Sequence, residues 1–164
     1  MYKHLLIATD GSECASAALE KAVEFARDNA AKVTFFFVTE PFHLFTVDKE
    51  QVERVRDEFS RYSREGANRH LQWARNLAQA HNVACDTAQL EHERPYEAII
   101  QAARLKECDL IAMGSHGYGG IEAAILGSVT QKVLTHCMIP VLVYPSHTPH
   151  LSKPASRHLT ERTH

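Results

Sequence analysis

The residues best suited to chemistry in this chain are Gly114-Ser115-His116-Gly117, followed after nine intervening residues by Gly127-Ser128. The motif lies between a short apolar segment and a segment with helical periodicity. Glycines let backbone N–H groups crowd around an anion, and the first amides of a helix add the positive end of its dipole. The spacing therefore indicates a phosphate site, although the same glycines would also serve a tight turn and a helix entry.

Three side chains could add polar contacts to such a site. Ser128 offers a hydroxyl to a phosphate oxygen or to a phosphate-bound Mg²⁺. His116 could donate to a phosphate or ribose oxygen, or it could simply face solvent. Asp10 ends the first apolar segment, where its carboxylate could accept from an exocyclic amine or a ribose hydroxyl, hold a metal, or only accept from turn amides. The residues alone leave the roles of Asp10 and His116 open.

Several better-known motifs are absent from the sequence. There is no Gly-x4-Gly-Lys-[Ser/Thr] motif, and Glu122 stands where Gly-x-Gly-x-x-Gly would need its third glycine. Neither His-Glu-x-x-His nor a paired cysteine spacing occurs, so no structural zinc site is expected. A Gly-x-Ser-x-Gly elbow and an evident general base are also missing, which argues against efficient hydrolysis.

Five apolar segments alternate with helical segments along the chain. This order requires a parallel sheet with helices on both faces and right-handed crossovers. In such a sheet ligands bind at the carboxyl ends of the strands, where the winding reverses, so residues after the first and fourth strands should meet. Gly66, inside the longest helical segment, could mark a bend. The expected strands are 2–9, 32–39, 83–90, 108–113 and 140–144, and the expected helices follow Ser12, cover 48–81, begin at Pro95 and cover 128–136.

Length and composition limit the remaining possibilities. The 164 residues, 45% hydrophobic and 23% charged, fit one globular domain rather than a fibre, a coiled coil or a disordered chain. A net charge of -2 gives no basic field for nucleic acid. No stretch approaches the roughly 20 apolar residues of a membrane helix. The four cysteines are far apart, which is typical of reduced thiols in a cytoplasmic protein.

The C-terminal end differs in composition from the rest. Residues 146–164 are rich in Ser, Thr, Pro and His and show no apolar period, so we expect a disordered tail behind a domain of residues 1–145. The tail carries four of the eleven histidines and a charge of +2, from three basic residues and one acidic residue. The histidine content therefore does not indicate metal binding by the domain.

Three motifs together resemble the universal stress protein family over about residues 2–145. They are 8–12 (Ala-Thr-Asp-Gly-Ser), the glycine motif from Met113 to Thr130, and 139–143 (Ile-Pro-Val-Leu-Val). The spacing Gly-x2-Gly-x9-Gly-[Ser/Thr] is similar to that of the ATP-binding branch. The resemblance implies a Rossmann-like α/β fold with five parallel strands in the order 3-2-1-4-5. It also implies a small cytoplasmic regulatory protein of the stress response, acting through nucleotide-dependent conformation or partner binding.

The resemblance also implies which residues contact the nucleotide. The adenosine would lie at the first two strand ends, and the phosphates at the glycine motif. The implied contacts run from Ala8, Thr9 and Asp10 to the adenine or its ribose, from Val38 to the adenine, from Met113 and Gly114 to the ribose, and from Gly117, Gly127, Ser128, Val129 and Thr130 to the phosphates.

By the same resemblance, the ligand is ATP with Mg²⁺ and the protein is a homodimer joined through the last strand, at Val141, Leu142 and Val143. Physical grounds favour the same pairing, because an apolar edge strand has backbone N–H and C=O groups without strand partners on its outer side. The alternative is an enzyme, a slow ATPase or a phosphoryl or adenylyl transferase that uses the same pocket. The missing base and the missing phosphate-loop lysine argue against efficient chemistry.

Overall fold

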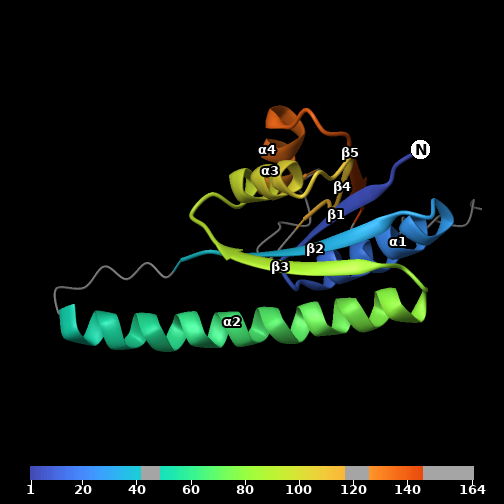
Figure 1. Cartoon of the computed structure of the whole chain (residues 1–164). Coiled ribbons are helices and arrows are strands. Elements are labelled where there is room, and N and C mark those ends of the chain that lie inside the picture. Colours follow the sequence, from blue (N-terminus) through green and yellow to red (C-terminus); the bar gives the residue numbers. More distant parts are fainter. Residues whose placement is uncertain (42–48, 117–125, 146–164) are drawn as a thin grey trace, which may run out of the picture.

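A computed structural model describes residues 1–41, 49–116 and 126–145. Within them, five parallel strands form one sheet in the order β3-β2-β1-β4-β5, which confirms the predicted architecture (Figure 1). The tail 146–164 and most of the loop before α2 lie outside the described residues. In chain order the elements are β1 (His4–Thr9), α1 (Glu13–Asp28), β2 (Lys32–Thr39), α2 (Lys49–Ala80), β3 (Cys85–Glu91), α3 (Pro95–Leu105), β4 (Leu110–Gly114), α4 (Ser128–His136) and β5 (Val141–Tyr144).

The central strands are buried on both faces. All six residues of β1 and all five of β4 are buried, while the edge strands β3 and β5 are only partly so. β1 pairs in parallel with β2 on one side, where Thr9 faces Phe37, and with β4 on the other, where Leu5 faces Leu110. Burial on both faces explains why these segments are apolar without alternation.

Two apolar layers hold the helices to the sheet. α1 and α2 cover one face, where Leu5, Ile7 and Phe35 belong to the core, and α3 and α4 cover the other, where Leu6 and Phe36 do (Figure 1). Side chains of successive β1 residues therefore pack into opposite layers, as the two-residue period of a strand requires. None of the helices in the described part of the chain combines the length and the apolar composition needed to span a bilayer.

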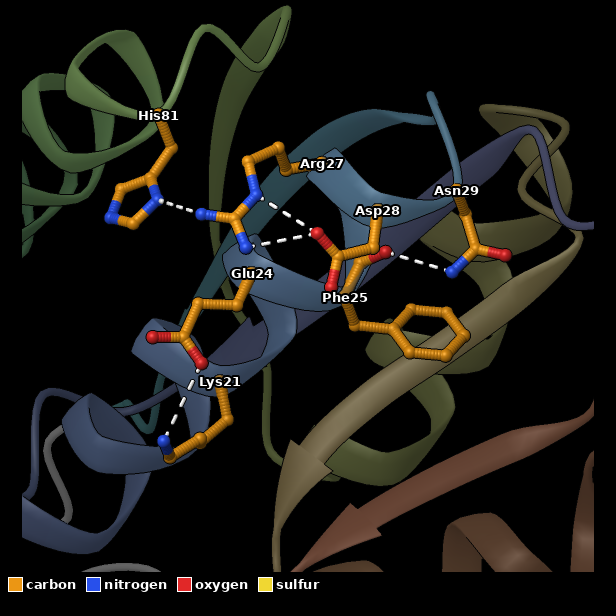
Figure 2. Close-up of polar contacts among 7 residues, drawn as sticks. All are labelled: Lys21, Glu24, Phe25, Arg27, Asp28, Asn29 and His81. Atoms are coloured by element: carbon orange, nitrogen blue, oxygen red, sulfur yellow. Dashed lines mark hydrogen bonds and ion pairs between the residues drawn. The ribbon is translucent and has the colours of Figure 1, made fainter.

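α1 begins and ends with local contacts. Ser12 caps its first turn as predicted, because the Ser12 Oγ accepts from the Ala15 N–H at 3.2 Å. Figure 2 shows the last turn, where the Arg27 guanidinium lies 2.9 Å from Asp28 Oδ1 and 3.4 Å from Nδ1 of His81, just past α2. These side chains are exposed, so the contacts align the two helix ends and add little stability.

α2 is the longest element and runs past the end of the sheet (Figure 1). Its 32 residues make a helix about 48 Å long, and it continues through Gly66 without the bend that this glycine could have marked (Figure 1). One face of its second half is buried against the sheet through Ala67, Leu71, Ala74 and Ala78. The first half carries the exposed apolar residues Val55, Phe59 and Tyr62.

His4 is a titratable group inside the core. Its side chain is 6% exposed, and Nε2 lies 2.8 Å from Thr34 Oγ1. Burial, with a smaller contribution from the positive charge of Lys32, lowers the pKa of His4 below its ordinary value of 6.5. The unfolded chain therefore binds the proton more readily than the folded chain.

We expect the free energy of unfolding to fall as the pH drops below about 6.5, because His4 then gains a proton only in the unfolded state. His4→Gln cannot titrate, so it should lose less stability than the wild type between about pH 7.5 and 5.5. Urea denaturation at each pH measures the difference. Equal losses in the two proteins would contradict a titrating His4.

Candidate functional site

The turn after β1 is organised by its own side chains. The Asp10 Oδ1 accepts from the Ser12 N–H at 3.0 Å, and the Thr9 Oγ1 accepts from the Gly11 N–H at 3.3 Å. Gly11 has a φ of +81°, in the region that favours glycine. These contacts hold the Asp10 carboxylate at the carboxyl end of β1, next to the start of α1.

The glycine motif is tied together at its two described ends. The Ser115 N–H donates to the Tyr144 carbonyl at 2.7 Å, and the Gly127 N–H donates to the Ser115 carbonyl at 2.8 Å. The Thr130 hydroxyl donates to the Gly114 carbonyl at 2.9 Å and is buried. The start of α4 is therefore bound directly to the end of β4.

Gly114 is required by a close approach of α1. A Cβ at this position would lie 3.1 Å from Cys14 Sγ and 3.3 Å from the His116 carbonyl oxygen. A Cβ here would force Cys14 or the backbone beside it to shift by a few tenths of an ångström. Glycine here lets the two turns, one after β1 and one after β4, stand side by side.

The N-terminus of α4 offers backbone donors. Gly127 is its extended N-cap residue and has no side chain that could accept from the first turn. The amides of Ser128, Val129 and Thr130 have no acceptor within the helix, and the helix dipole adds partial positive charge there. Ser128 is exposed, so its hydroxyl is accessible beside these amides.

These features surround one cavity of about 460 Å³ at the carboxyl edge of the sheet. The structure brings every described residue of the predicted site to its walls, while Gly117 lies outside the described residues. The predicted residues that line it are Ala8, Thr9, Asp10, Val38, Met113, Gly114, His116, Gly127, Ser128, Val129 and Thr130.

Sequence reasoning missed other lining residues for two different reasons. Some lie next to segments already assigned to the site, at the end of β2 and the start of α1, and others lie in α3, whose start the sequence had located without assigning it to the site. Phe59 and Ser63 on α2 carry no such signal, because only the length and packing of that helix bring them to the cavity. The missed residues are Ala15, Phe37, Thr39, Glu40, Phe59, Ser63, Pro95 and Ile99.

His70 on α2 supports the turn after β1 from outside the motif. Its Nε2 lies 2.9 Å from Thr9 Oγ1, and its ring packs 5.6 Å from Phe37 and 5.2 Å from Trp73, measured between ring centroids. Burial lowers the pKa of His70, and the negative charge of Asp10 opposes that shift. α2 is thus connected to the wall of the cavity through a half-buried polar contact.

The cavity differs chemically from one side to the other. α2 packs on β2 and β3, whereas α4 lies beside α3 and β5, so the two helices flank opposite sides. The α4 side offers amide and hydroxyl donors, and the α2 side offers the apolar side chain of Phe59. Val38 of β2 packs with the layer of α3 and α4, and the Asp10 carboxylate follows the end of β1. No group of three or more His, Cys, Asp or Glu among the described residues could hold a metal ion.

The fold and cavity define a doubly wound parallel α/β protein whose candidate site lies where the winding of the sheet reverses. Residues 1–145 match the model of the universal stress protein family. The chain belongs to this family, as the motifs at the strand ends predicted.

Known relatives agree with this assignment. The chain is 30% identical over 143 residues to universal stress protein MJ0531 of Methanocaldococcus jannaschii, covering 87% of this chain and 82% of that one. It is 32% identical over 143 residues to a universal stress protein of Thermus aquaticus, covering 87% and 98% of the two chains. The solved structure of hypothetical protein MJ0577 superposes with a TM-score of 0.76 at 28% identity, covering 90% of this chain and 99% of that one.

Two more distant structures share the fold and contain nucleotides. One is a universal stress protein in complex with cAMP, with a TM-score of 0.65 over 89% of this chain and 99% of that one. The other, from Archaeoglobus fulgidus, is in complex with dAMP, with a TM-score of 0.56 over 87% and 97% of the two chains. Each is 20% identical to this chain.

Two glycine-to-alanine substitutions should change stability in opposite directions. Gly11→Ala places a Cβ at φ +81° and 3.3 Å from the Phe37 ring, so it should lower the free energy of unfolding by about 1 kcal/mol or more. Gly66→Ala, in the interior of α2 with its nearest atom at 3.9 Å, should raise it by about 0.5–1 kcal/mol. Urea denaturation of both variants measures the free energy of unfolding. Changes of the same sign would refute the different backbone roles given to Gly11 and Gly66.

Proposed function

We propose that this protein binds an adenine nucleotide, ATP with Mg²⁺, in the cavity at the carboxyl edge of the sheet. The observation that carries the proposal is that the ends of β1, β2 and β4 and the N-terminus of α4 line one cavity of about 460 Å³. That size suits a small organic ligand, and the position is where doubly wound sheets bind theirs.

The residues present fit such a ligand. The amides of Ser128, Val129 and Thr130 would bind phosphate oxygens, and the exposed Ser128 hydroxyl would reach a phosphate or its bound Mg²⁺. His116 lines the same wall and would donate to a phosphate or ribose oxygen. The Asp10 carboxylate would accept from a ribose hydroxyl or the adenine amine.

The remaining lining residues would shape the site around the nucleoside. Val38 would contact the adenine, with Ala8 and Thr9 beside it, and Met113 and Gly114 would lie against the ribose. The related structures in complex with cAMP and dAMP support an adenine nucleotide as the ligand class. We therefore infer a regulatory role in the stress response, in the cytoplasm, exerted through nucleotide-dependent conformation or partner binding.

Two separate variants, each lacking one hydroxyl at one end of α4, test the phosphate contacts. Ser128→Ala should weaken ATP binding about tenfold, because it removes a hydrogen bond to a charged acceptor. Thr135→Ala is the matched control, since its hydroxyl bonds carbonyls of its own helix far from the cavity and should leave affinity unchanged. Isothermal titration of both variants gives the affinities, and equal values would overturn the phosphate assignment.

Ligand identity and turnover need a separate measurement. Protein purified without added nucleotide should release an adenine nucleotide on denaturation, identified by mass spectrometry. Incubation with ATP should then yield no phosphate and no AMP. Turnover that Ser128→Ala abolishes would instead establish the alternative, a slow ATPase or a phosphoryl or adenylyl transferase in the same pocket.

We also propose a homodimer formed through β5. The carbonyls of Pro140 and Tyr144 accept from the N–H groups of Ile111 on β4 and of Ser115 just after it, at 3.0 and 2.7 Å. Because successive residues of a strand direct their backbone groups to opposite sides, Val141 and Val143 direct theirs to the open edge, with Leu142 between them. An apolar edge strand with open backbone groups is suited to pairing with a second copy.

Val143→Pro should convert the dimer into a monomer, because proline removes an outward N–H while every bond to β4 remains. Val143→Ala, which keeps the N–H, is the control and should stay dimeric. Size-exclusion chromatography with light scattering gives the masses. A monomeric wild type, or a dimeric Val143→Pro, would contradict pairing through β5.

A further inference from the structure

The first half of α2 forms a wall of the cavity that lies outside the sequence motifs. We propose that Phe59 on this helix contacts the planar base of the bound nucleotide, so that the site selects ligands with a flat aromatic group over bare phosphate chains. The inference rests on the proposed nucleotide binding and assigns the residue that contacts the base from the α2 side.

The position of Phe59 follows from the packing of its helix. Residues four apart lie along one ridge of a helix, and Phe59, Ser63, Ala67 and Leu71 form such a ridge. Ala67 and Leu71 are buried against the sheet, and Phe59 and Ser63 line the cavity. The ridge therefore changes from core to cavity wall where α2 runs past the ends of the strands (Figure 1).

Three contacts fix α2 along its axis. The Arg75 guanidinium donates to Thr87 Oγ1 at 2.9 Å, and the Gln89 side-chain amide donates to Asn68 Oδ1 at 2.8 Å, both between α2 and β3. The third is the 2.9 Å contact between His70 and Thr9 of β1. With its register set in this way, α2 holds Phe59 at the cavity as part of a rigid helix.

The chemistry of the surrounding walls suits a flat apolar group. Phe59 is 40% exposed, although the residues beside it on α2 are mostly charged. Pro95 and Ile99 line the cavity from α3, on the other face of the sheet, and Val38 lines it from β2. A base held among these apolar side chains would leave the phosphates to the amides at the N-terminus of α4.

Stacking of an aromatic side chain on a base does not depend on which base is present. Phe59 therefore accounts for the preference for a nucleotide over a bare polyphosphate, and hydrogen bonds from Asp10 and the strand ends would select adenine. The neighbouring aromatic Tyr62 is 70% exposed and does not line the cavity, so it provides a control on the same helix.

The test compares two ligands, ATP and inorganic tripolyphosphate, by isothermal titration. Phe59→Ala should weaken ATP binding about tenfold and leave tripolyphosphate binding unchanged, because only ATP carries a base. Tyr62→Ala should bind both ligands as the wild type does. Phe59→Tyr keeps the ring and should retain the affinity for ATP, whereas Phe59→Leu fills similar space without a ring and should not.

The outcomes separate this inference from the proposed function. A wild-type protein that binds no nucleotide overturns the proposed function, and the role of Phe59 with it. If the wild type binds ATP while Phe59→Ala matches Tyr62→Ala, or weakens both ligands equally, only the inference fails. If Phe59→Ala does not fold, the ATP affinities of Phe59→Tyr and Phe59→Leu are compared instead. Equal affinities of these two variants would overturn the proposed contact between Phe59 and the base.

Discussion

The whole molecule depends on the parallel pairing of β1 with both β2 and β4. A strand flanked on both sides must bury both of its faces, so it draws α1 and α2 to one face and α3 and α4 to the other. The chain leaves β1 in one direction to form β2 and β3, and later returns on its other side to form β4 and β5. That reversal separates the connections at the carboxyl edge and leaves the space that becomes the cavity.

Short backbone contacts turn this space into a site. The links from Gly127 to Ser115 and from Thr130 to Gly114 place the N-terminus of α4 beside the end of β4. The absence of a side chain at Gly114 lets the first turn of α1 come close as well. The donors at α4 and the Asp10 carboxylate are thereby positioned by hydrogen bonds within the strands and turns, which limits their rearrangement when a ligand binds.

α2 contributes to both stability and site construction. Its buried ridge covers β2 and β3, and the same ridge continues into the cavity wall at Phe59 and Ser63. His70 lies within the span of the buried ridge and contacts Thr9 at the end of β1. Because one helix performs both tasks, changes in its packing would be transmitted to the cavity.

The sequence by itself determined the order of elements and the parallel sheet, because those features depend on local patterns: apolar runs, Ser12 before a helix, and Pro95. The spaced glycines and Asp10 also indicated a site at the strand ends, whereas lining residues such as Val38 and Met113 were implied only by the resemblance to the family. Gly66 shows the limit of such patterns, since a residue that could bend a helix lies inside a straight one. Only the tertiary structure decided that Phe59, Ser63 and His70 belong near the site. Their positions depend on how far α2 runs past the sheet and how it is rotated against it, and packing between distant segments sets both.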